Sequence, residues 1–199
     1  MIGGLLGVVG MAVTAGGIAA ALLNPTVSLP GNIITAGHLT IEVNQGESSG
    51  LSFANLAPGD TRTADQLLTG DLTGVSTADL ALALGIPSST TAPDEFLDNA
   101  LLSVSYSEPS TPAGLGWTSG SPDCSSAATW NPIIAPTQLS ALDASQTYDL
   151  GEMTHTPLQD AICVRYTLTL DASTTNPAQG ASIGLTLNYS LTQTGAVDQ

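Results

Sequence analysis

The chain contains one long uncharged run, Met1 to Leu23, whose only polar side chain is Thr14. Water cannot accommodate so many adjacent apolar residues at low cost, so the run must be cleaved off, enter a membrane or be buried in protein. The rest of the chain is polar and prone to form strands. The fate of this run therefore constrains the molecule more than any other feature.

Three interpretations of the run are open from its residues. The small residues 19–21 suit a signal-peptidase site, but no positive charge precedes Arg62, so the n-region of a signal peptide is missing. About 20 apolar residues can also span a bilayer, and Gly3 and Gly7 form a G-x-x-x-G pair. The third interpretation is an assembly element buried in another subunit.

Charge excludes several classes of function. The 199 residues suit a single domain with a substantial core. Arg62 and Arg165 are the only Lys or Arg residues, against 17 acidic ones, which gives a net charge of −15. Nucleic-acid binding and polybasic attraction to anionic lipid both need a basic footprint, which is absent. With 42% hydrophobic and 10% charged residues, the chain is not an acidic disordered tail.

The two cysteines, Cys124 and Cys163, are predicted to form a disulfide if the protein is exported. The bond would close a loop of about 40 residues and contribute roughly 4 kcal/mol in the chain-entropy model. Two buried free thiols are the alternative. A zinc site is not indicated, because the cysteines, His38 and His155 lack motif spacing.

Alternating apolar residues predict mainly strands, placed at 35–43, 61–69, 78–84, 101–107, 161–170 and 181–192. The Ala/Leu content of 78–84 also permits a helix. A short helix is predicted at 94–100, where acids begin the segment, and one helical turn at 139–144. The stretch 108–126 is predicted to be a long surface loop tied down by the disulfide. Many short strands separated by turns indicate an all-β antiparallel sandwich.

Five segments occur in a recognisable order: Asn32 to Ile41 (NIITAGHLTI), Leu56 to Thr61 (LAPGDT), Val164 to Asp171, Asn176 to Ser182 (NPAQGAS) and Leu185 to Gln193. With the apolar leader before them, they resemble the TasA/camelysin family of exported fibre subunits, which includes archaeal bundling-pilus subunits. The resemblance covers about residues 1–193 and rests on the order of the motifs. Two features depart from the family: Leu22-Leu23 stand where an aromatic is usual, and lysine is absent.

The resemblance implies an all-β, jelly-roll-like sandwich that ends in a hairpin at the N-x-x-Q-G motif. It also implies polymerisation by donor-strand exchange into an extracellular, cell-surface filament that supports biofilm or cell–cell contact. Residues 1–31 would be the assembly segment and linker, and 32–199 a single β-sandwich domain. The partners would be identical subunits, head to tail, and neighbouring filaments in bundles. No cofactor and no stable membrane span in the mature form are expected.

The donor is expected within Ile2 to Val13. Its apolar side chains are Ile2, Leu5, Leu6, Val8, Val9, Met11 and Val13. Four or five of them buried in a neighbour would contribute roughly 6–15 kcal/mol before costs. Such a head-to-tail contact does not close on itself and so produces a filament.

Motifs for catalysis are missing, so the chain is not expected to be an enzyme. Neither His38 nor His155 belongs to an H-E-x-x-H sequence, and no motif singles out a nucleophilic serine. Carboxylate pairs could be drawn from Asp94 with Glu95 or from Asp143 with Asp149, but such acids usually begin helices or face solvent. Asn188-Tyr189-Ser190 is a formal glycosylation sequon, which makes Asn188 a candidate for modification.

Three alternatives to the filament subunit remain at this stage. The first is a type IV-like pilin whose first 23 residues form a core helix. The second is a hydrolase anchored by its N-terminus. The third is a monomeric cell-surface adhesin that binds through the loop 108–126.

Overall fold

A computed structural model describes residues 26–28, 39–44, 51–72, 75–85, 92–117, 124–143, 145–155, 159–175 and 181–194. The expected donor segment, His38 and residues 29–38 lie outside these ranges. In the ranges described, no helix has the length and apolar character needed to cross a membrane.

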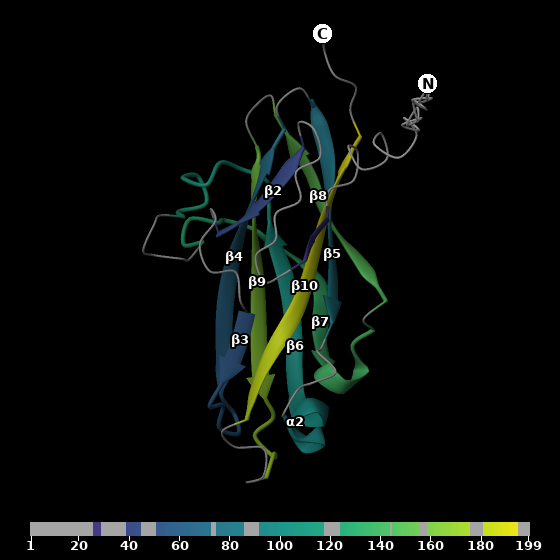
Figure 1. Cartoon of the computed structure of the whole chain (residues 1–199). Helices are drawn as coiled ribbons and strands as arrows, with labels where there is room; N and C mark the ends of the chain where they lie inside the picture. The colour runs from purple at the N-terminus through teal and green to yellow at the C-terminus, as the bar shows by residue number, and fades with distance from the viewer. Residues whose placement is uncertain are drawn as a thin grey trace, which may run out of the picture.

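The described chain is an antiparallel β-sandwich (Figure 1). Its strands are β1 (Thr26–Ser28), β2 (Thr40–Val43), β3 (Leu51–Ala54), β4 (Thr61–Asp71), β5 (Thr77–Gly85), β6 (Ala100–Ser107), β7 (Trp130–Gln138), β8 (Thr147–Thr154), β9 (Ala161–Leu170) and β10 (Ser182–Gln193). A short helix, α2 (Asp94–Asn99), precedes β6, and a 3₁₀ turn, η2 (Leu139–Ala141), follows β7.

The eight strands from β3 to β10 have jelly-roll connectivity. One sheet, here called sheet 1, has the order β1-β10-β5-β8, with β3 also paired to β10. The other, sheet 2, has the order β2-β4-β9-β6-β7. The core order β3-β10-β5-β8 against β4-β9-β6-β7 is that of two interlocked Greek keys. Among these eight, only β6 and β7 are consecutive strands paired as a hairpin.

The alternation of apolar and polar residues along the strands explains how the two sheets pack. Leu39, Ile41 and Val43 turn inward at β2, as their spacing predicted. β9 buries Ile162, Val164, Tyr166, Leu168 and Leu170, and β10 buries Ile183, Leu185, Leu187, Tyr189 and Leu191. Together with inward residues of β5 and β6 they form one continuous core between the sheets.

Several sequence expectations are confirmed. The segment 78–84 is strand, within β5, so its helical alternative is wrong. The short helix is α2, whose first turn carries Asp94 and Glu95. The turn before β4 is present, with Gly59 at φ 86°, a left-handed value that glycine adopts without strain.

Two expectations need correction. The expected final hairpin is wrong, because β9 belongs to sheet 2 and β10 to sheet 1, so their connection crosses between the layers. The strands β1, β3 and β7 were not among those placed from the sequence, and neither was β8. Its buried residues, Leu150 and Met153, are three apart because Gly151 has a φ of 91° and the β5–β8 register shifts between Asp79 and Ala81, which breaks the two-residue period.

Candidate assembly edge and the disulfide network

In the described ranges, one edge of β10 is covered incompletely. Its inner edge pairs with β5 from Thr186 to Gln193. On the outer edge, β3 pairs with 182–185 and β1 pairs with 188–190. Two short strands therefore share this edge without meeting, and no strand in the described chain pairs there with Leu191 or Thr192.

The edges at β7 and β8 carry features that discourage the addition of a strand. β7 contains Pro132 and Pro136, and proline cannot donate a ladder hydrogen bond. β8 carries Asp149, Glu152 and the irregular Gly151. β10, by contrast, has neither charge nor proline over its whole length. Among these strands, it is the one best suited to accept an added strand.

A buried polar chain fixes β10 against sheet 2. The Tyr189 hydroxyl donates to Gln66 Oε1 at 2.6 Å, and the hydroxyls of Tyr166 and Tyr189 are 2.5 Å apart. Burial is the main cause that raises the pKa of both phenols, so they stay protonated. Because Tyr189 comes from sheet 1 and the other two from sheet 2, the chain sets the position of β10 across the core.

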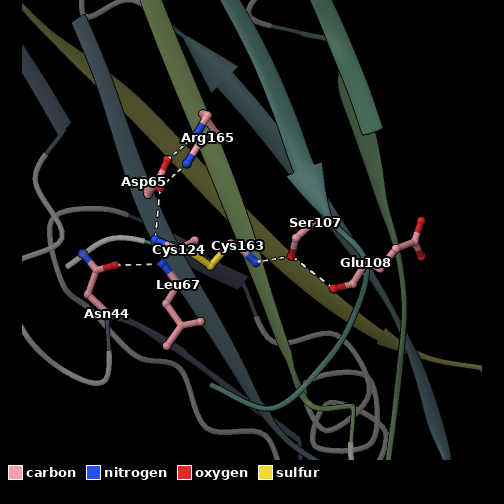
Figure 2. The surroundings of a disulfide bond; sticks show 8 residues. All are labelled: Asn44, Asp65, Leu67, Ser107, Glu108, Cys124, Cys163 and Arg165. Carbon is pink, nitrogen blue, oxygen red and sulfur yellow. Dashed lines mark hydrogen bonds and ion pairs between the residues drawn. A yellow bond between two sulfur atoms is a disulfide. The ribbon is translucent and has the colours of Figure 1, made fainter. Parts of the chain in front are cut away.

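The predicted disulfide between Cys124 and Cys163 is present, with the two Cα atoms 6.3 Å apart (Figure 2). It lies in a second apolar cluster, separate from the core between the sheets. The cluster consists of Leu67, Leu115, Trp117, Cys124, Ala161 and Cys163, with Ala127 and Trp130 against it. The β6–β7 loop is thereby fastened to the outer side of β4 and β9.

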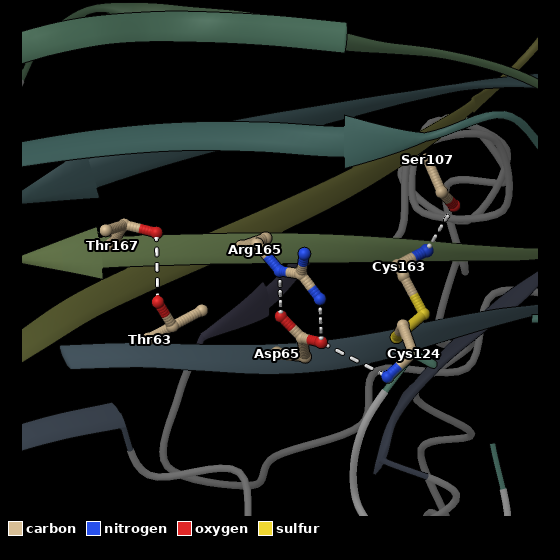
Figure 3. A network of polar contacts seen from close by, with 7 residues as sticks. All are labelled: Thr63, Asp65, Ser107, Cys124, Cys163, Arg165 and Thr167. Carbon is tan, nitrogen blue, oxygen red and sulfur yellow. Dashed lines mark hydrogen bonds and ion pairs between the residues drawn. A yellow bond between two sulfur atoms is a disulfide. The ribbon is translucent and has the colours of Figure 1, made fainter. Parts of the chain in front are cut away.

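An ion pair supports the same attachment (Figure 3). Arg165 on β9 donates from Nε and Nη2 to the two carboxylate oxygens of Asp65 on β4, each at 2.7 Å. The Cys124 N–H donates to Asp65 Oδ2 at 3.1 Å, and the Arg165 guanidinium lies 3.9 Å from the centroid of Trp130.

Side-chain oxygens receive backbone donors beside the disulfide (Figure 2). The Leu67 N–H donates to Asn44 Oδ1 at 3.0 Å, and the Cys163 N–H donates to Ser107 Oγ at 3.0 Å. Ser107 in turn donates to the Glu108 carbonyl oxygen at 3.1 Å. These bonds let the cluster lie outside the sheet without losing backbone hydrogen bonds.

The acids considered as carboxylate pairs have local partners. Asp143 Oδ1 accepts from the N–H and hydroxyl of Ser145 at 2.8 and 2.6 Å, bonds that lower its pKa. Asp149 accepts from the Gly151 N–H at 2.7 Å. Glu95 accepts from the N–H and hydroxyl of Thr175. These hydrogen bonds stabilise turns and loops, and the acids do not converge on one site.

The remaining candidates are separate from one another. His155 is exposed in the turn after β8, and its backbone N–H donates to the Ser76 carbonyl oxygen at 3.0 Å. Asn188 is half-buried within β10, opposite Ser28 and Ala83. A depression of about 520 Å³ beside β2 is lined by Thr40, Glu42, Thr69, Gly70, Asp71, Leu72, His155 and Asp160. Even so, the described residues include no group of three or more His, Cys, Asp or Glu placed to hold a metal ion.

Sequence reasoning missed the β10 edge and Asp65. The first left a visible signal, a twelve-residue strand without charge or proline, although its position at an incomplete edge depends on the sheet order. The ion pair between Asp65 and Arg165 left no signal in the sequence, because it joins residues 100 positions apart through the register of β4 on β9.

No family model matches the chain, and no curated protein matches it. Among solved structures, it is similar to the crystal structure of the infectious bursal disease virus VP2 subviral particle, with 9% identity and a TM-score of 0.37. It is also similar to the structure of the infectious bursal disease virus Gt strain, with 8% identity and a TM-score of 0.31. Each match covers 79% of this chain and 32% of the other, so the chain spans about a third of their length.

Proposed function

We propose that this chain is a structural subunit of an extracellular, cell-surface filament, and not an enzyme. The apolar N-terminal segment of one subunit would add to the outer edge of β10 in the next. Filaments of this kind would support biofilm or cell–cell contact, and neighbouring filaments would join into bundles. The resemblance to exported fibre subunits supplies the biological setting of this proposal.

The observation that carries the proposal is the outer edge of β10. It is uncharged and free of proline, and the described chain covers it with two short strands that do not meet. An extended segment from a neighbour would complete the backbone hydrogen bonds there, and its alternate side chains would pack against the sandwich. No comparable edge occurs at β7 or β8, where prolines, acids or an irregular glycine intervene.

The apolar run precedes β1 in the sequence. β1 pairs Thr26 with Ser190 and Ser28 with Asn188, in antiparallel sense. The proposal places the run beyond β1 in a second subunit, where burial would remove it from water.

The experiment compares the full chain with a variant lacking residues 1–13, both exported and examined by electron microscopy. Filaments from the full chain and folded monomers from the truncated chain are the expected result. Filaments from the truncated chain would contradict the donor assignment. Failure of both to polymerise would contradict the filament function and favour a monomeric adhesin.

A matched pair of point variants tests the donor more finely. Val8→Asp places a charge in the expected donor and should abolish filaments, because a carboxylate would have to be buried. Thr14→Asp adds the same charge one residue beyond the donor and should retain them. Equal loss in both variants would mean that charge anywhere in the run is harmful, and would contradict the proposed donor boundary.

A further inference from the structure

The outer side of sheet 2 carries a regular, electrically neutral array in a strongly acidic protein. Three adjacent strands contribute three residues each, in register: Thr61, Thr63 and Asp65 from β4, Thr169, Thr167 and Arg165 from β9, and Leu101, Ser103 and Ser105 from β6. We call these nine residues the hydroxyl face. Its only charges are those of Asp65 and Arg165, which neutralise each other through two 2.7 Å hydrogen bonds.

The threonines of the hydroxyl face form hydrogen-bonded pairs between β4 and β9. The Thr61 and Thr169 hydroxyls are 2.9 Å apart, and those of Thr63 and Thr167 are 3.3 Å apart (Figure 3). Within each pair one hydroxyl donates to the other, so one hydrogen per pair stays available to a partner. Strand spacing of about 4.8 Å and a side-chain repeat of about 6.8 Å make the array periodic.

The outer side of sheet 1 differs in charge. Asp79 on β5 lies directly opposite Glu152 on β8, and Asp149 lies on the same strand as Glu152. No cation accompanies these three acids in the described part of β5, β8 and β10. In a chain of net charge −15, two copies would repel each other strongly through this side.

We infer that the hydroxyl face is a lateral contact surface whose partner is the hydroxyl face of a second copy of this chain. Hydroxyls both donate and accept, so the array is complementary to itself. Within each copy the Asp65 carboxylate, only 6% exposed, offsets the charge of Arg165, so no net charge of this face opposes the contact. A cationic or anionic partner would gain little from a neutral surface.

The inference rests in part on the proposed filament. A patch of nine residues is too small for a tight dimer of single subunits. Repeated along two filaments, the same weak contact would act many times and hold them side by side. The hydroxyl face would thus be the surface through which filaments form bundles.

The test compares Thr63→Asp with Thr147→Asp. Both threonines are exposed strand residues that lie two positions before an aspartate, Asp65 and Asp149, but only Thr63 belongs to the hydroxyl face. Electron microscopy counts bundled and single filaments, and sedimentation of the full chain measures lateral association independently. Thr63→Asp should reduce the bundled fraction roughly tenfold while single filaments persist, because the loss at each contact is repeated along the filament. Thr147→Asp and Thr63→Ser should bundle like the unchanged chain.

The outcomes separate this inference from the proposed function. Bundling of Thr63→Asp at the unchanged level, or equal loss in Thr147→Asp, would overturn the lateral contact and leave the filament function intact. Single filaments that never associate in the unchanged chain would also overturn it. If the unchanged chain formed no filaments but sedimented as weak, concentration-dependent dimers that Thr63→Asp abolished, the lateral contact would stand and the filament function would fail.

Discussion

The two sheets of the sandwich are secured in different ways. Sheet 2 is fastened from outside by a disulfide, an apolar cluster and the Arg165–Asp65 ion pair, which together hold the β6–β7 loop against β4 and β9. On sheet 1, the described chain shows no covering loop of this kind. Its outer side carries mutually repelling acids, and its edge at β10 ends in two short strands.

In the proposed filament, this contrast would separate stability from assembly. The covalent and ionic attachments lie on the sheet that does not contain β10. An exchange of strands at β10 would therefore leave them undisturbed. The buried tyrosine pair joins the two sheets, so sheet 2 can act as the fixed support against which the edge of β10 is presented.

The largest expected effect comes from removing the disulfide that fastens the β6–β7 loop to sheet 2. Replacing both cysteines by serine should lower the free energy of unfolding by about 4 kcal/mol, because the bond closes a loop between residues 39 positions apart. Denaturant titration measures this loss, and filament formation should survive wherever the domain stays folded. A loss below about 1 kcal/mol would show that the apolar cluster alone holds the loop.

A smaller effect is expected from the ion pair. Arg165→Met leaves the Asp65 carboxylate, 6% exposed, without its cation and should cost about 2 kcal/mol of unfolding free energy. This value is reduced for solvent screening because the Arg165 side chain is one-third exposed. The control is Arg62→Met, whose exposed pair with Asp60 spans 3.6 Å and should cost less than about 0.5 kcal/mol. Similar losses in the two variants would show that the Arg165–Asp65 pair stabilises the fold no more than the exposed Arg62–Asp60 pair does.

The smallest effect concerns the acidic side of sheet 1. Burial, followed by repulsion from Asp149 and Glu152, raises the pKa of Asp79 above 3.8. Its ionisation therefore opposes folding above that raised pKa, and the penalty disappears as pH falls through the raised value toward 3.8. Asp79→Asn should stabilise the protein by a few tenths of a kcal/mol at neutral pH, and the gain should vanish near pH 3.8 in melts across that range.

Asp143→Asn is the control of opposite sign. Hydrogen bonds from Ser145 lower the pKa of Asp143, so its ionisation favours folding above 3.8 and this contribution is lost as pH falls through the lowered value. The asparagine variant should therefore lose stability at neutral pH. If both variants shifted stability in the same direction, local electrostatics would not explain the difference between these acids.

Sequence reasoning captured what local alternation determines. The inward faces of 39–43, 161–170 and 181–192 follow from a two-residue period, and the strands were placed accordingly. It failed at β8, where an irregular glycine sets Leu150 and Met153 three apart. It also could not decide whether the turn-rich link before β10 stays within one sheet or crosses to the other, because sheet order is set by contacts between distant strands.

The candidate site divides in the same way. The cysteine pair could be predicted because composition alone names both partners. The incomplete edge of β10 required the sheet order, and the hydroxyl face required the register of three strands. The expected donor residues lie outside the described ranges and stay a prediction.

The placement of the two arginines has a consequence for resistance to proteases. Proteases that cut after lysine or arginine have only two bonds to attack, following Arg62 and Arg165. Both bonds lie within strands of sheet 2, paired across β4 and β9. A protease needs its substrate in an extended form free of such pairing, so cleavage must wait for the sheet to open. A chain of this design would resist trypsin-like digestion for as long as it stays folded.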